Sequence, residues 1–411
     1  MDLKYEIIFE HLAKQESEEN FADIFNVVQD KIIKSMNCEV IYNFAKKFEH
    51  YANIQKCGTA IIESGNAEYN YLFAKNIKNA NIKSHSEAVI NSKDYNYNYL
   101  FACHIKGPNL KEHEKVIAEG GHIDYIIDYI NANEIADIKF FTDAVCENYY
   151  IHDIYEYALK VKNADIKKLS NAVIKDGAPY FNFMFAKEIP GANVSEHARV
   201  VIESGDEQSN FMFCYLPNAD IKAHSEAVIR SGSAQFNYLM AKIFNNINKK
   251  AHEQVVIESG DNEYNYLFAS QIKNADIKAH EQVILKNKNT KYNYLFAKNI
   301  KGSDISAHAK VVIESRNAEY NYLFANNIPQ TDVKAHQNVV IESKNSKYIF
   351  LFAMNVPNAD IKELIDAFKK SDYNDCEFFE EWRTCPIETL EKKLKENETI
   401  SKNIEDLINE L

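Results

Sequence analysis

One motif recurs along this chain at a nearly fixed interval and limits what the chain can fold into. The segments YNYLFAKNIKNANIKSHSEAVINS from residue 69, YNYLFASQIKNADIKAHEQVILKN from residue 264 and YNYLFAKNIKGSDISAHAKVVIES from residue 292 are near copies. The alanine of the FA pair, or its replacement, falls in steps of 27 to 29 residues at Ala45, Ala74, Ala102, Ile130, Ala158, Ala186, Cys214, Ala241, Ala269, Ala297, Ala325 and Ala353. Such a period is typical of solenoids, in which each repeat is one supersecondary unit.

Each repeat contains two helical patterns. In the repeat that begins near residue 264, apolar side chains recur at helical spacing over residues 264–272 and again over residues 277–284. Asn274 interrupts the pattern, and Asp276 suits the N-cap of the second helix. We call the two predicted helices helix A and helix B. A lone pair of short helices cannot bury its own apolar face, so we expect an all-α, right-handed α-solenoid of about twelve 28-residue helix-turn-helix repeats.

Both ends of the chain depart from the repeat. Residues 21–35 align as a lone helix B with a polar helix before it, and the segment from Ser371 onward turns acidic and contains Trp382, the only tryptophan. Terminal repeats need a polar outer face. We therefore predict an N-terminal helical cap at 1–36, the twelve-repeat solenoid at 37–370 and an acidic C-terminal helical cap at 371–411. The alternative for the tail is a docking appendage.

The repeat also resembles a known type. YNYLFAKNI followed by NADIKAHEQVVIES resembles an uncharacterised short helical-hairpin repeat of low-GC bacteria and their phages, over nearly the whole chain. In architecture that family is similar to HEAT and TPR solenoids, although the TPR pattern itself is absent. The resemblance implies a fold and says little about activity, because solenoids host many functions.

Composition narrows the class of partner and the compartment. The formal net charge of −13 argues against a protein that mainly neutralises phosphates, although a local basic strip is compatible with it. The seven cysteines are scattered without CxxC spacing, so we expect no disulfide framework, no zinc site and a reducing, cytoplasmic location. No run of about 18 uncharged apolar residues occurs, so we expect no signal peptide and no membrane span.

Eight repeats carry a polar pair at fixed places. Helix B has a histidine at one position, and helix A of the same eight repeats has an asparagine four residues before the alanine. The expected structural pairs are Asn70 with His85, Asn98 with His113, Asn182 with His197, Asn210 with His224, Asn237 with His252, Asn265 with His280, Asn293 with His308 and Asn321 with His336. The other four repeats lack both residues and have Ile41 with Cys57, Ile126 with Phe141, Ile154 with Leu169 and Ile349 with Leu364.

This co-occurrence needs a cause. If the exceptions fell independently, the two sets would coincide in roughly one of 495 arrangements. Helical geometry places the asparagine in the middle of the apolar face of helix A, where a buried amide needs a partner. We therefore expect a buried Asn–His hydrogen bond within each hairpin, since a half-satisfied buried pair costs more stability than an apolar one. Metal ligation by the row of histidines and a shared duplication history are the alternatives.

A second periodic set lies on another side of helix A. The residue three before the alanine lies about 40° from the residue after the alanine and about 20° from the residue four after it. These are tyrosine and lysine positions, and the predicted partner-binding residues are Tyr71, Lys75, Tyr99, Tyr238, Tyr266, Lys273, Tyr294, Lys298 and Tyr322. They would suit an acidic or extended partner. The alternative is that the tyrosines pack between repeats and the lysines are merely solvated.

The fourth and fifth repeats, residues 121–177, depart furthest from the pattern. Asp128 and Glu156 replace an apolar position, and Tyr149 and Tyr150 are added near a loop. A defect in a regular array indicates a bend or a partner site. Drift under weak constraint is the alternative.

No catalytic motif accompanies the repeat. The sequence has no Walker loop, GxGxxG, HExxH or GxSxG motif, so we predict no catalytic, cofactor-binding or metal-binding residues. The function that follows is a non-enzymatic scaffold that binds another protein along the inner surface of the solenoid. The phage-like resemblance and the acidic charge point to one alternative, an inhibitor of a host defence nuclease such as a CRISPR effector. The other alternative is a HEAT-like nucleic-acid-binding protein or enzyme that uses the lysines.

Overall fold

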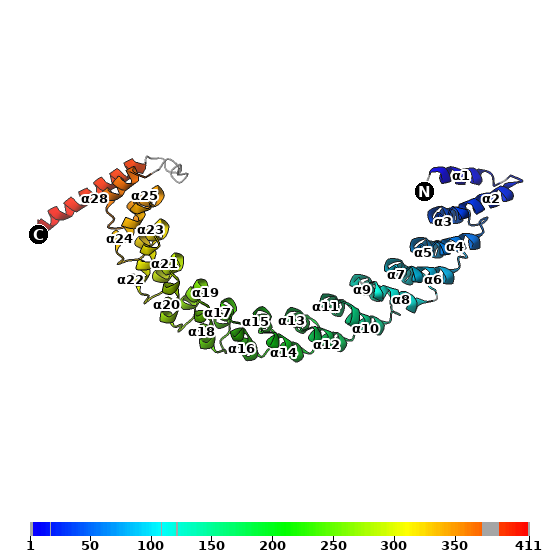
Figure 1. Cartoon of the computed structure of the whole chain (residues 1–411), viewed down its shortest axis with the longest axis horizontal. Helices are drawn as coiled ribbons and strands as arrows, with labels where there is room; N and C mark the ends of the chain where they lie inside the picture. Colours follow the sequence, from blue (N-terminus) through cyan, green and yellow to red (C-terminus); the bar gives the residue numbers. More distant parts are fainter. Residues whose placement is uncertain (1–2, 17, 108, 121, 372–385, 410–411) are drawn as a thin grey trace. The chain divides into compact units, whose positions relative to one another are not determined.

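The chain is all-helical, as its sequence predicts. The computed structural model describes residues 3–16, 18–107, 109–120, 122–371 and 386–409, and in these residues it has 27 helices and no strand. Consecutive helices pair into antiparallel hairpins (Figure 1). The expected all-α solenoid of helical hairpins is therefore confirmed.

Twelve hairpins follow one another along the chain. The helices A are α3 (Cys38–Lys47), α5 (Ala67–Asn76), α7 (Tyr95–His104), α9 (Ile123–Ala132), α11 (Ile151–Lys160), α13 (Pro179–Glu188), α15 (Glu207–Phe213), α17 (Ala234–Ile243), α19 (Asn262–Gln271), α21 (Thr290–Asn299), α23 (Ala318–Asn327) and α25 (Ser346–Asn355). The helices B are α4 (Ile54–Glu63), α6 (Ile82–Ser92), α8 (Leu110–Glu119), α10 (Ile138–Asn148), α12 (Ile166–Asp176), α14 (Val194–Ser204), α16 (Ile221–Ser231), α18 (Lys249–Ser259), α20 (Ile277–Asn287), α22 (Ile305–Glu314), α24 (Val333–Glu342) and α26 (Ile361–Lys369).

The helices gather into two compact units, Met1–Ser204 and Gly205–Leu411, a division that the repeat pattern does not predict. Within each unit, every helix A contacts the next helix A and every helix B contacts the next helix B (Figure 1). Each unit is therefore built of two layers, a helix-A layer and a helix-B layer. The surface of the helix-A layer is called the helix-A face below.

Capping residues and left-handed turns set the helix boundaries. Asp276 caps α20, because its side chain accepts the backbone N–H of Ala279 at 3.0 Å. Asn274 has φ of 63°, a conformation that asparagine tolerates better than most residues, and it turns the chain from helix A to helix B. Both features agree with the boundaries expected from the sequence.

The hydrophobic core runs between successive hairpins. One buried cluster joins Ala297 of α21, Val312 of α22 and Phe324 of α23, so the phenylalanine of α23 closes the core of the hairpin before it. Phe268, Phe296 and Phe324 are at most 1% exposed. A single hairpin leaves this face open, which explains why the repeat occurs as an array.

Both ends carry helical caps. At the N-terminus, α1 (Leu3–Lys14) and α2 (Phe21–Lys34) bury Phe9 and Phe25 against Phe44, with ring centroids 5.5 and 5.1 Å away. At the C-terminus, α28 (Pro386–Asn409) packs against α25 and α26 and buries Leu390. Trp382 lies outside the described residues. None of the described helices is long and apolar enough to cross a membrane.

Candidate binding surface

The asparagine of helix A is a fully used hydrogen-bonding group. In the hairpin of α19 and α20, Asn265 Nδ2 donates to the carbonyl oxygens of Val256 (2.8 Å) and Asp261 (2.7 Å). Asn265 Oδ1 lies 2.7 Å from His280 Nδ1, and both side chains are 0% exposed. Because both amide protons are already used, Oδ1 must accept and Nδ1 must carry the proton. The amide thus joins its own helix B to the helix B before it.

The same Asn–His contact is present in all eight repeats that carry the pair. The Nδ1–Oδ1 distances are 2.8 Å for His85–Asn70, 2.6 Å for His113–Asn98, 2.7 Å for His197–Asn182, 2.8 Å for His224–Asn210, 2.7 Å for His252–Asn237, 2.7 Å for His280–Asn265, 2.7 Å for His308–Asn293 and 2.7 Å for His336–Asn321. The hydrogen bond expected within each hairpin is confirmed. A protonated Nδ1 is not a metal ligand, and no group of three or more His, Cys, Asp or Glu in the described part of the chain could hold a metal ion.

Seven of the eight imidazoles also lie against the phenylalanine of their own helix A, and the exception is His252, because α17 has Met240 at that position. The ring centroids of Phe101 and His113 are 4.8 Å apart, and those of Phe268 and His280 are 5.2 Å apart. Burial in this apolar environment lowers the pKa of His113 and of His280 to about 4. The histidines are therefore neutral at neutral pH, as the hydrogen-bonding pattern requires.

In part of the hairpins the other ring nitrogen contacts the preceding hairpin, which the repeat pattern did not predict, whereas Nε2 of His85, His224 and His280 has no hydrogen-bond partner among the described residues. Because Nδ1 carries the proton, Nε2 accepts, and serine hydroxyls donate to it over 2.9 Å from Ser86 to His113, 2.7 Å from Ser170 to His197 and 2.7 Å from Ser225 to His252. Each serine stands one residue after the histidine position of the helix B before. A serine repeated at this position would have predicted the contact. Gly, Ser, Glu, Thr, Gln and Ala all occur there, so the sequence shows no repeated partner.

In the fourth and fifth repeats, tyrosines supply the hydrogen-bond partner of the residue that follows the histidine position in the preceding helix B. These repeats lack the Asn–His pair, and Tyr129 and Tyr157 stand where most other helices A have the phenylalanine. The Tyr129 hydroxyl donates to Glu114 Oε1 at 3.0 Å, and the Tyr157 hydroxyl lies 3.2 Å from Thr142 Oγ1. Glu114 and Thr142 occupy the position of the serines above, so the phenol replaces the imidazole as their partner.

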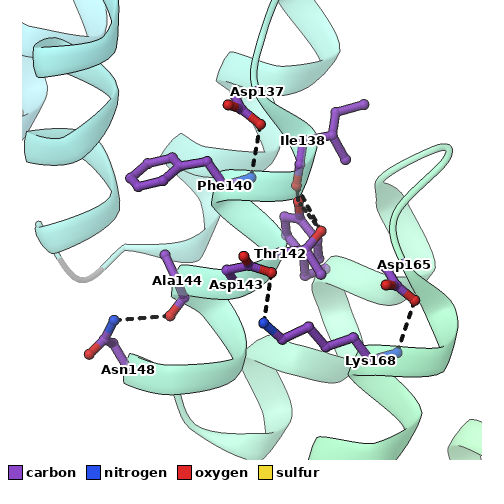
Figure 2. A network of polar contacts seen from close by, with 10 residues as sticks. Asp137, Ile138, Phe140, Thr142, Asp143, Ala144, Asn148, Asp165 and Lys168 are labelled. Carbon is purple, nitrogen blue, oxygen red and sulfur yellow. Dashed lines mark hydrogen bonds and ion pairs between the residues drawn. The ribbon is translucent and has the colours of Figure 1, made fainter.

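Further polar contacts tie the fifth hairpin to the fourth (Figure 2). Thr142 Oγ1 donates to the Ile138 carbonyl at 2.8 Å within α10, and Lys168 of α12 forms a 2.7 Å ion pair with Asp143 of α10. The largest buried apolar cluster of the first compact unit surrounds these residues. The two irregular repeats are therefore well packed.

The structure corrects the predicted tyrosine strip. Tyr71, Tyr238 and Tyr294 are only 4–5% exposed, so they do not form an open ladder of rings. Tyr99, Tyr266 and Tyr322 are half-buried, whereas Lys75, Lys273 and Lys298 are exposed. The rings pack against the next helix A, with Tyr294 and Tyr320 centroids 6.0 Å apart. The tyrosines therefore pack between repeats, which was the alternative to an open binding strip.

The exposed lysines lie next to the hydroxyl ends of these tyrosines. Lys75 Nζ donates to the Tyr71 hydroxyl at 2.6 Å, and Lys298 Nζ donates to the Tyr294 hydroxyl at 3.1 Å. The same phenols contact polar groups of the next helix A. The partners are Asn76 for Tyr42, His104 for Tyr71, Glu188 for Tyr155, Gln271 for Tyr238, Asn299 for Tyr266, Asn327 for Tyr294 and Asn355 for Tyr322.

This Tyr–amide contact was also readable in the sequence. The phenol stands three residues before the alanine, and its partner stands two residues after the alanine of the next repeat. Where Phe211 replaces the tyrosine, the partner position holds Ile243. At this boundary apolar residues therefore replace both members of the polar contact, whereas Tyr99 with Ala132 and Ile127 with Lys160 do not follow the pattern.

Comparison with protein-family models, with curated proteins and with solved structures finds no match for this chain.

Proposed function

We propose that the chain is a non-enzymatic, cytoplasmic scaffold that binds another protein along its helix-A face. One observation supports this most: the C-terminal ends of the helices A present a periodic row of hydrogen-bond donors. In the second compact unit the row consists of Lys242, Lys298, Asn299 and Asn355, which donate to a tyrosine hydroxyl, and Gln271, whose oxygen accepts from the Tyr238 hydroxyl and leaves its amide protons for a partner. We call these residues the donor row.

The spacing of the donor row suits an extended polypeptide. Packed helices lie about 8–10 Å apart, and an extended chain rises about 3.3 Å per residue. About three residues of a bound segment would therefore pass each hairpin, so its carbonyls and carboxylates would meet the donors in register. The tyrosines below hold Lys242 and Lys298 in place through their hydroxyls, at 3.0 and 3.1 Å, which lowers the entropic cost of binding.

The cytoplasmic part of the proposal rests on the cysteines. Cys38, Cys57, Cys103, Cys146 and Cys214 form no disulfide within the described residues. Burial raises the pKa of the Cys57 and Cys214 thiols to about 12, so they behave as small apolar core residues. Such thiols fit a reducing compartment.

The test is affinity capture from the native cell lysate, with protein and nucleic acid both identified. The variant that matters carries Lys242→Glu and Lys298→Glu, and the matched control carries Lys278→Glu and Lys310→Glu, two exposed lysines on helices B. We expect one stoichiometric protein that the first variant loses and the control retains. Capture of nucleic acid alone, of nothing, or of a protein that both variants lose equally would contradict the proposal.

A further inference from the structure

The helix-A face of the second compact unit changes from polar to apolar at one place. In α19, α21 and α23, the two residues after the repeat's alanine are Ser270 and Gln271, Lys298 and Asn299, and Asn326 and Asn327. After α15, the equivalent residues are Tyr215 and Leu216, and at the end of α17 the second residue is Ile243. Tyr215 is 58% exposed and Ile243 is 43% exposed. Apolar side chains thus stand where the fold itself accepts lysine and asparagine.

The aromatic rings of Phe211, Tyr215 and Phe244 pack against one another. The centroid distances are 5.5 Å between Phe211 and Tyr215, 5.5 Å between Tyr215 and Phe244, and 6.1 Å between Phe211 and Phe244, with steep interplanar angles. Phe236 lies 5.6 Å from Phe211 and supports the group from α17. We call Phe211, Tyr215, Ile243 and Phe244 the aromatic patch. Because each ring restricts its neighbours, little side-chain entropy remains to be lost on binding.

The two segments that form the aromatic patch carry charge of one sign. Lys242 is the only charged residue in residues 211–219 and 236–248. Its Nζ lies 3.0 Å from the Tyr238 hydroxyl and 5.3 Å from the Tyr238 ring centroid, so Tyr238 orients the cation at the end of α17, which also carries Ile243. An apolar centre with one oriented cation at its edge complements an apolar anchor followed by a carboxylate.

We propose that the aromatic patch is the anchor point for the protein partner. The partner segment places an aliphatic or aromatic side chain against Tyr215 and Ile243 and a carboxylate on Lys242. This inference rests on the proposed protein-binding function and adds the site and the chemistry of the bound segment. Aromatic residues in such a preorganised group carry a disproportionate share of binding energy in protein interfaces.

The experiment is selection of random linear peptides displayed on phage against the full chain, followed by affinity measurements on the enriched sequences. The patch variant carries Tyr215→Lys and Ile243→Asn, which install the residues that α21 has at these places and so preserve the fold. The control carries Tyr180→Lys, which removes a 51% exposed aromatic residue elsewhere and adds the same charge. Thermal unfolding verifies that all three proteins are folded.

We expect enriched peptides with an apolar residue next to Asp or Glu. Their dissociation constants should rise at least about tenfold in the patch variant, stay unchanged in the control and rise a few-fold in Lys242→Gln. Absence of enrichment, or peptides that bind the patch variant as tightly, would overturn the anchor proposal. So would a concentration-dependent dimer that the patch variant loses, because the patch would then bind a second copy. Lysate capture that depends on Lys242 and Lys298 would still support protein binding in each of these cases.

Discussion

At the scale of single residues, the chain keeps its buried asparagines in the core by pairing each of them with a histidine, although Nε2 of His85, His224 and His280 has no hydrogen-bond partner among the described residues. Asn265 uses both amide protons and its oxygen, and His252 uses Nδ1 toward Asn237 and Nε2 toward Ser225. Satisfied buried groups are tolerated, whereas an orphaned one costs its full desolvation. This explains why four hairpins carry apolar residues at both positions instead of one.

A double-mutant cycle on Asn265→Ile and His280→Leu tests this coupling. Each single change leaves one polar group unpaired in the core and should lower the free energy of unfolding by about 1–3 kcal/mol. The double change should cost less than the sum, because it recreates the Ile–Leu pair that Ile349 and Leu364 form in the last hairpin. Chemical denaturation of the four proteins provides the measurement. Strict additivity would show that the two side chains are not coupled.

The buried histidines should make the fold sensitive to acid. Burial lowers the pKa of His113 from 6.5 to about 4 in the folded chain, so between these values the unfolded chain binds more protons. Stability is full above about pH 6.5 and decreases as pH falls toward about 4. Removing the pair with Asn98→Ile and His113→Leu should make the decline shallower, on the order of 1 kcal/mol at about pH 5.5. An unchanged slope in denaturation series across this range would refute the assignment.

Glu253 should act in the opposite direction. Its Oε1 accepts the Asp276 backbone N–H at 2.5 Å and lies 3.4 Å from His280 Nε2, which is itself an acceptor. Burial raises the pKa of the Glu253 carboxyl, so its carboxylate becomes more costly as pH rises through the folded pKa. Glu253→Gln should keep the bond to Asp276, as Gln337 does to Asp360 at 2.8 Å, and supply a donor for Nε2.

The expected result is a higher unfolding midpoint for Glu253→Gln at neutral pH and no difference from the parent below about pH 4.3, where the carboxyl is protonated in both states. Thermal unfolding at several pH values measures it, with the exposed Glu258→Gln as the control on the same helix. A midpoint that is equally shifted at every pH would mean that the carboxylate charge is not the cause.

The sequence predicted the Asn–His contact, because these two positions vary together. It did not predict the contact at histidine Nε2, because the residue type there changes from repeat to repeat. The asparagine and histidine are either both present or both absent, so their contact within one hairpin was predictable. The group that faces Nε2 is Ser86 for His113 but Glu281 for His308, at 3.2 Å, and Thr331 for His336, at 3.1 Å. A varied partner leaves no repeated pattern to read.

At the scale of helices, the polar pair is kept even when a helix is shortened. α15 has seven residues whereas the other helices A have ten, and one residue is missing between Asn210 and His224. The Asn210–His224 distance is nevertheless 2.8 Å. The hydrogen bond therefore positions the hairpin, and the helix end adjusts to it.

The misplaced tyrosines show the limit of reasoning on one helix. The helical wheel sets Tyr294 apart from the face that meets its own helix B, which indicates exposure for an isolated hairpin. In the solenoid, helix A also has neighbouring helices A, and Tyr294 is 5% exposed against the next one. The stacking of hairpins, which no single repeat encodes, decides the burial of this residue.

Helix capping gives a prediction at this scale. Asp332 accepts the Ala335 backbone N–H at 3.0 Å at the start of α24. Asp332→Ala should lower the free energy of unfolding by about 1 kcal/mol, whereas Asp332→Asn should leave it nearly unchanged, because asparagine caps helices equally well. Equilibrium unfolding of both variants decides, and equal losses would argue that charge and not capping is responsible.

At the scale of the whole molecule, the acidic charge is concentrated at the ends. Residues 1–36 carry a net charge of −4 and residues 371–411 carry −7, which leaves only −2 for the twelve repeats. The net charge therefore describes the caps and not the helix-A face. The sequence predicted the array of helical hairpins, but not the division at Ser204, because the repeat continues across that point.

The central claim is that the buried Asn–His network holds the fold while the donor row binds the partner. The most direct test compares two variants in one capture experiment, Asn265→Ile with His280→Leu, and Lys242→Glu with Lys298→Glu. The account predicts that the first retains the protein partner despite lower stability, and that the second loses it while remaining as stable as the parent. Loss of the partner by the core variant and retention by the lysine variant would contradict the account.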